Sequence, residues 1–223
     1  MPPSQVRWTA YGAQAQGELR EVITEAKRTD PLAPLTVVVP SDLAGVVTRR
    51  FLASGVTEGS PPRRGIAGLQ ILTVDRLAEQ LATAALVDTG RRPATNPVLA
   101  AAWRRTLAAD SGIFAHVAAH PATVQALVDA HRTLRDLSAP GIDAVAASGP
   151  LTKDLVRLHR QVVGLLARSW SDAADLRAAA VRAIADRPET ARALGTIVTF
   201  LPQDLAQSQA ALLRRSRPQR ILS

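Results

Sequence analysis

The stretch LTVVVPSD, residues 35–42, decides the fold of this chain. Its first five residues form an unbroken run of apolar and β-branched side chains, which is typical of a strand buried on both faces. Pro40 closes the strand, and Ser41 then stands where a helix N-cap belongs, with Asp42 in the first turn. The stretch therefore predicts a buried strand, a turn and a helix that runs to about Ala53.

The same order of strand and helix occurs on both sides of this stretch. Before it, residues 6–11 predict a strand, a turn covers residues 12–16, and a helix follows over residues 17–28. After it, LQILTV at residues 69–74 predicts a third strand that leads into a helix over residues 75–87. This alternation indicates an α/β fold, with a parallel sheet and crossover helices.

From about Asn96 the pattern changes to helices alone. We expect these helices at residues 97–109, 123–137, 153–169 and 172–186, separated by glycines and prolines. A buried strand returns at residues 196–201, followed by a helix at 203–215 and a strand at 219–222 that is cut short. We expect residues 1–90 to form the first part of the α/β domain and residues 91–187 to form a helical insertion. Residues 188–223 then return to the α/β domain, which we expect to be truncated at the C-terminus, with the natural fold continuing further.

Composition narrows the classes of function. The chain has 27 Arg or Lys residues against 19 Asp or Glu, and only Lys27 and Lys153 are lysines. This excess of arginine favours a nucleic-acid partner, although it can also reflect a GC-rich genome. Without cysteine there is no disulfide, thiolate zinc site or iron–sulfur cluster. No apolar run approaches the roughly 18 residues of a membrane span, so we expect a cytoplasmic protein with no membrane partner.

The first turn has the glycine spacing of a phosphate-binding loop. GAQAQGEL, residues 12–19, places Gly12 and Gly17 as G-x-x-x-x-G-K-[ST] requires, between a strand and a helix. Glu18 stands at the lysine position and Leu19 at the position of the Mg²⁺-binding hydroxyl. A carboxylate there repels a triphosphate, so the sequence predicts no useful ATP binding. Two glycines five apart can also be a coincidence.

A second nucleotide motif is altered in the same way. The strand at residues 196–201 ends in Phe200 and Leu201, and the segment PQDLAQSQ follows. This segment resembles motif II of UvrD/Rep-type, superfamily-one helicases, with Gln203, Asp204 and Gln209 in register. The resemblance implies a RecA-like, degenerate P-loop NTPase fold. Phe200 and Leu201 replace the Asp-Glu pair that binds Mg²⁺ and positions the attacking water in that family.

The order of these segments resembles the N-terminal, helicase-like region of bacterial PD-(D/E)XK nuclease family proteins, similar to the B subunit of AddAB-type helicase–nucleases. The resemblance implies a part in double-strand break repair and recombination, with DNA and a helicase subunit as partners. No nuclease constellation is found here, so we expect no catalytic residue, cofactor or metal. By the resemblance and by their places at strand ends or in a loop, Ser41, Arg63, Arg64 and Thr73 are the candidate DNA contacts.

Two other interpretations stay open. The chain can be a divergent NTPase that uses another cation in place of the missing lysine, or a protein–protein module or gene fragment. Among the histidines, His116 and His120 have the spacing of a metal pair without a third ligand. His131 and His159 lie in amphipathic helices and are interpreted as interface or surface groups.

Overall fold

The structure is a computed structural model that describes residues 5–54, 65–87, 89–203, 205–216 and 219–222. The chain divides into two compact units. The first contains Met1–Thr83, Arg177–Leu205 and Gln209–Ser223, and the second contains Ala84–Leu176 and Ala206–Ser208. Each unit is described below by itself.

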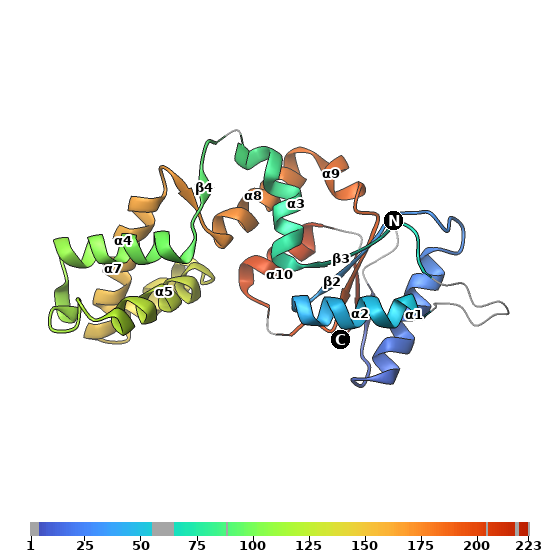
Figure 1. Ribbon diagram of the computed structural model, residues 1–223, viewed down its shortest axis with the longest axis horizontal. Helices are drawn as coiled ribbons and strands as arrows, with labels where there is room; N and C mark the ends of the chain where they lie inside the picture. The colour runs from blue at the N-terminus through green and yellow to red at the C-terminus, as the bar shows by residue number, and fades with distance from the viewer. Residues whose placement is uncertain (1–4, 55–64, 88, 204, 217–218, 223) are drawn as a thin grey trace. The chain divides into compact units, whose positions relative to one another are not determined.

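The first unit is built on a parallel sheet (Figure 1). Its strands lie in the order β1-β7-β6-β2-β3, with bounds Gln5–Arg7, Gln219–Leu222, Thr196–Phe200, Leu35–Val39 and Leu69–Thr73. Val37 of β2 pairs with Ile71 on one side and with Val198 on the other. All five residues of β2 are buried, so both faces of the sheet are covered at this strand. The molecule is therefore an α/β protein with a parallel sheet, as the sequence predicts.

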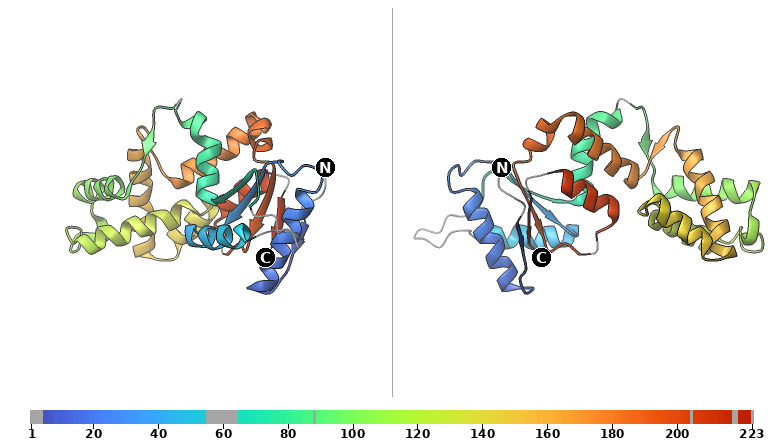
Figure 2. Two further views of the ribbon diagram at one scale, coloured as in Figure 1. Left: turned by 45° about the vertical axis from the view of Figure 1, so that its right-hand side comes forward. Right: turned by 180° about the vertical axis from the view of Figure 1, so that it is seen from behind.

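Helices cover the two faces of this sheet (Figure 2). The helices that begin in this unit are α1 (Ala13–Ala26), α2 (Asp42–Ala53), α3 (Val74–Val87) and α9 (Pro188–Arg192). Leu19 and Ile23 of α1 and Leu52 of α2 pack with Val37 and Val198, which forms the core on one face. On the other face, the buried Thr36 hydroxyl donates a hydrogen bond of 2.8 Å to the Leu194 carbonyl that follows α9.

The second unit is helical apart from a short pair of strands. Trp103, Leu158 and Val162 are fully buried at the centre of its core. Its elements are β4 (Arg92–Pro93), α4 (Asn96–Ala109), the 3₁₀ turn η1 (Gly112–Phe114), α5 (Pro121–Arg135), α6 (Ala139–Ala147), α7 (Pro150–Leu166) and β5 (Trp170–Ser171). Helices α8 (Ala173–Asp186) and α10 (Gln207–Arg215) have residues in both units.

Several expected boundaries are wrong, and most of the errors come from proline. Pro140 is expected to break the chain, but it lies in the first turn of α6, with Ser138 as N-cap and its hydroxyl accepting from the amide of Gly141. Proline is tolerated in the first helical turn because the amide it lacks has no partner there. For the same reason α5 and α7 begin at Pro121 and Pro150, and α9 begins at Pro188 where the helical block is expected to end.

The two internal histidines of the second unit are buried, which corrects their expected surface placement. His131 of α5 and His159 of α7 are 1% and 2% exposed, and their ring centroids are 4.7 Å apart. Nε2 of His131 lies 3.6 Å from Oδ2 of Asp172, which also accepts a hydrogen bond of 2.6 Å from Nε of Arg135. Burial and the neighbouring His131 and Arg135 lower the pKa of His159 to about 4.

This cluster makes the second unit sensitive to acid. Folded His159 stays neutral at pH 5, whereas the unfolded chain binds a proton there at the ordinary pKa of 6.5. The contribution of His159 to the free energy of unfolding is therefore complete above about pH 7 and falls by up to roughly 3 kcal/mol between pH 6.5 and 4. Circular dichroism melts across this range should show the loss. His159→Leu should remove most of it, and the exposed His116→Gln should not. An unchanged pH profile in His159→Leu would contradict the assignment.

Candidate functional site

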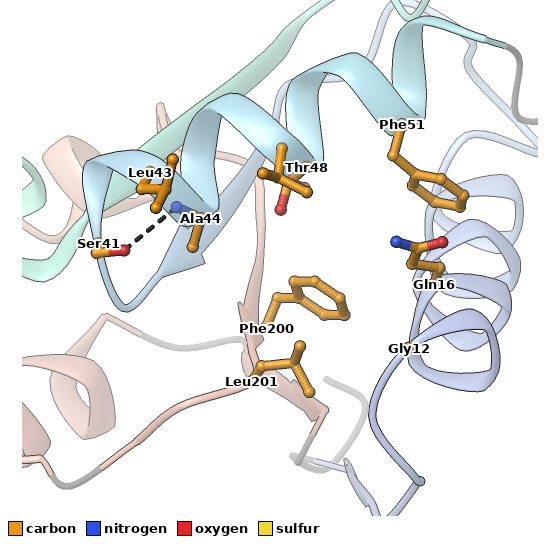
Figure 3. A pocket seen from close by; sticks show the side chains of 10 residues that line it. Gly12, Gln16, Ser41, Leu43, Ala44, Thr48, Phe51, Phe200 and Leu201 are labelled. Atoms are coloured by element: carbon orange, nitrogen blue, oxygen red, sulfur yellow. Dashed lines mark hydrogen bonds between the residues drawn. The ribbon is translucent and has the colours of Figure 1, made fainter.

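A pocket of about 330 Å³ lies in the first unit, at the carboxyl ends of β2 and β6 (Figure 3). Three segments form it: the start of α1, helix α2 with its N-cap, and the end of β6. In that order they contribute Gly12 and Gln16; Ser41, Leu43, Ala44, Val47, Thr48 and Phe51; and Phe200 and Leu201. None of these lining residues carries a charge, so the pocket offers apolar surface and a few neutral polar groups.

The topology of the sheet explains this location. From β2 the chain passes through α2 to β3, on one side of the sheet order. From β6 it passes through α10 to β7, on the other side. The two connections diverge from neighbouring strands, which leaves a crevice beyond their carboxyl ends. Ligands of open parallel sheets bind in this crevice, and the pocket occupies it.

Two helices start at the pocket. Gly12 is the N-cap of α1, with φ of 91° and ψ of −135°, a backbone conformation that requires glycine. Ser41 is the N-cap of α2, and its hydroxyl accepts a hydrogen bond of 3.2 Å from the amide of Ala44. Each helix start carries partial positive charge from its free amides. The pocket therefore has a weak positive potential from the backbone without any cationic side chain in its lining.

The expected phosphate-binding loop is not formed. Helix α1 begins at Ala13 instead of Gly17, so the residues between the two glycines are helical and cannot wrap phosphates. Gly17 lies inside α1, Leu19 is fully buried in the core, and neither lines the pocket. Glu18 accepts a hydrogen bond of 2.8 Å from Nη1 of Arg7 on β1, so its carboxylate is engaged in an ion pair. Of these four positions, Gly12 alone belongs to the pocket.

The end of β6 closes the pocket with apolar groups. The ring of Phe200 points into the space between α1 and α2, and Leu201 lies beside it (Figure 3). Leu201 has φ of 48°, a left-handed conformation that is uncommon for a residue with a branched side chain. Such strain persists where the surrounding structure holds it, often at a binding site. Phe200 and Leu201 supply no side-chain oxygen that could bind Mg²⁺.

The other predicted site residues lie outside the pocket or outside the described part of the chain. Gln203 is exposed and does not line the pocket. Thr73 ends β3, next to β2, and its hydroxyl accepts a hydrogen bond of 3.4 Å from the amide of Arg76. Ser41 and Thr73 thus lie at the ends of neighbouring strands, and both hydroxyls cap the helix that follows. Asp204, Arg63 and Arg64 lie outside the described residues.

Several lining residues are not predicted from the sequence. Gln16 belongs to α1, and Ala44, Thr48 and Phe51 follow each other at helical spacing on α2. That spacing indicates only an inward face, and the partner elements come from tertiary packing. Phe51 also carries the guanidinium of Arg20 at 4.0 Å above its ring. The scarcity of aromatic residues, at 3% of the chain, is the signal that could have singled out Phe51.

The described residues contain no group of three or more His, Cys, Asp or Glu side chains placed to hold a metal ion. Nδ1 of His120 accepts a hydrogen bond of 3.2 Å from the amide of Ala122, so this histidine caps α5. Across the described ranges, no helix combines the length and hydropathy needed to cross a membrane. No protein family model matches the sequence, and no curated protein matches it either.

The two glycines of the expected loop should respond to alanine in opposite ways. Gly17→Ala should raise the free energy of unfolding by about 0.5–1 kcal/mol, because Gly17 is inside a helix with open space around its Cβ position. Gly12→Ala should lower it by about 1 kcal/mol or more, since alanine is strained at a φ of 91°. Urea denaturation of both variants measures the difference. Destabilisation by Gly17→Ala would instead favour a loop at this position.

Proposed function

We infer that this chain is a helicase-like module of a DNA-repair helicase–nuclease that binds DNA or holds a partner motor subunit without hydrolysing nucleotide. The observation that carries this inference is the uncharged pocket, which occupies the ligand crevice of the parallel sheet. Both segments that resemble nucleotide motifs of superfamily-one helicases contribute to this one pocket, through Gly12 and through Phe200 and Leu201. A RecA-like relationship explains why two motifs far apart in sequence lie together.

The chemistry of the lining argues against phosphoryl transfer. A nucleoside triphosphate carries several negative charges, which NTPases neutralise with a lysine and a Mg²⁺ ion held by acidic and hydroxyl groups. Here the lining has no charged side chain, and the carboxylate of Glu18 is paired with Arg7. Two helix starts supply only about half a unit charge each. The balance of charge therefore disfavours a bound triphosphate.

The distribution of basic residues supports a nucleic-acid partner. The net charge is +8, and nearly all of the positive charge is arginine, whose planar fork engages two phosphate oxygens. Arg49 and Arg50 are exposed on α2, the helix that forms one wall of the pocket. Arg76 is exposed at the start of α3 and shares a 2.8 Å ion pair with Glu79. These arginines lie on the helices that follow β2 and β3. Ser41 and Thr73 lie at the carboxyl ends of these two strands.

Nucleotide titration tests the absence of a motor. With Mg²⁺ present, isothermal calorimetry should detect no ATP binding up to millimolar concentration, because the lining lacks a cation. Micromolar binding that Gly12→Val abolishes would show that the chain is a divergent NTPase instead.

Salt dependence tests the DNA partner. Fluorescence anisotropy with a labelled single-stranded oligonucleotide should show binding that weakens roughly 50-fold between 50 and 200 mM salt, as expected for about four phosphate contacts. The charge-reversal pair Arg49→Glu and Arg50→Glu should weaken binding, while Arg28→Glu, at the opposite end of the sheet, serves as the matched control. Affinity that does not change with salt would refute the DNA-binding role.

A further inference from the structure

Aromatic side chains gather at the pocket. The chain has three Trp, one Tyr and three Phe residues. Phe51 and Phe200 line the pocket, while Trp8 and Tyr11 lie in the segment between β1 and Gly12. The other three aromatic residues belong to the core of the second unit, where Trp103 is buried and Phe114 and Trp170 pack against it. In the first unit, the aromatic residues therefore either line the pocket or lie in the short segment that leads to its lining residue Gly12.

Two of these side chains project into solvent. Trp8 is 83% exposed and Tyr11 is 73% exposed. The segment that carries them leaves the carboxyl end of β1 and ends at Gly12, a lining residue. Leu43, also a lining residue, is 74% exposed on the first turn of α2. Exposed aromatic rings are the groups on which unpaired bases stack in proteins that bind single strands.

The interior suits a flat, neutral, heteroaromatic group. The side chains of Gln16, Thr48 and Phe51 surround the ring of Phe200 (Figure 3). The Gln16 amide offers both a donor and an acceptor, as the edge of a nucleobase requires. A volume of about 330 Å³ is at the lower end of small-ligand sites and is enough for one base.

Cationic groups lie beside this interior but outside it. The guanidinium of Arg20 stacks 4.0 Å over the ring of Phe51 and donates a hydrogen bond of 3.2 Å to the Ser54 hydroxyl. Arg50 follows Leu43 and Val47 at the spacing of one helix face of α2. The neutral aromatic surface inside the pocket suits a base, and the arginines beside the pocket suit the phosphates of the same strand, which would stay outside.

We propose that this pocket and the aromatic segment at residues 8–11 bind unpaired bases of single-stranded DNA, with one base inside and its neighbours stacked on Trp8 and Tyr11. The proposal rests on the DNA-binding role inferred above and assigns that role to a site. Bases in a duplex are paired and stacked, so the site selects single strands. No triphosphate is involved, and the site thereby differs from the nucleotide site of the helicases that the chain resembles.

Tryptophan fluorescence tests the stacking directly. The intact chain is titrated with oligothymidylate, with a duplex of equal length, and with heparin as a polyanion without bases. Oligothymidylate should quench the emission of Trp8, and the other two should not. The difference between wild type and Trp8→Leu isolates this signal from that of Trp103 and Trp170. Quenching by heparin equal to that by oligothymidylate would overturn the proposal. In a further titration, quenching by an uncharged amphipathic peptide but not by oligothymidylate would overturn it in favour of a protein partner.

Variants separate this proposal from the general DNA-binding role. Trp8→Ala with Tyr11→Ala should weaken oligothymidylate binding by about 5- to 100-fold for each base that no longer has a ring to stack on, with the salt slope unchanged. Leu43→Glu should weaken it as well, and Leu32→Glu, at an equally exposed position on the loop before β2, is the control that adds the same charge. All four positions are exposed, so equal melting temperatures should show that folding is intact. If wild-type binding depends steeply on salt but these variants bind with unchanged affinity, the assignment to the pocket is overturned and the DNA-binding role is not. If the wild-type chain does not bind oligothymidylate at all, both inferences are overturned.

Discussion

The buried strand β2 is the constraint on which the rest of the first unit depends. Its backbone groups pair with β3 on one side and with β6 on the other, and all five of its side chains are buried. A strand in this position needs neighbours on both edges and helices on both faces, because unpaired backbone groups in a dry core are costly. Since the connections that leave β2 and β6 run to opposite sides of the sheet order, the crevice opens at the end of β2. The pocket is thus a consequence of how this one strand is covered.

Local signals in the sequence predict this part of the fold well. The strand at 35–39 and the helix that ends at Ala53 have the expected bounds, and Ser41 caps that helix as its position predicts. These elements depend on short-range properties, namely β-branched runs, proline and a capping hydroxyl. The expected start of α1 is wrong because Ala13-Gln-Ala-Gln is a run of good helix formers, and this helix propensity outweighs the spacing of the two glycines. The expected bounds of the helices that begin at proline are wrong for a similar reason. Proline breaks a helix in its interior but is favoured in the first turn, so its presence does not distinguish an end from a start.

The site is less predictable because its residues meet only in the folded chain. Gly12, Ser41, Phe200 and Leu201 are found from strand ends, where parallel topology alone brings them together. Gln16, Thr48 and Phe51 come from helix faces, and helical spacing does not say which element such a face will meet. Burial of His131 against His159 is another case, because an amphipathic helix shows the same period whether a histidine at its edge is covered or exposed. The ion pair of Glu18 with Arg7 is a third feature that depends on tertiary packing, because it forms only when α1 packs beside β1.

The uncharged lining limits what this crevice can hold. Two helix starts at the pocket give some positive potential, but Phe200 and Leu201 line the end of β6 with apolar surface. In such an environment a free negative charge would lose hydration without gaining a counter-ion, and burial of an unpaired charge costs several kcal/mol. A flat neutral group loses little hydration and can pack against two phenyl rings. The strained backbone of Leu201 fits the same account, because its left-handed turn brings the end of β6 into the pocket beside the Phe200 ring.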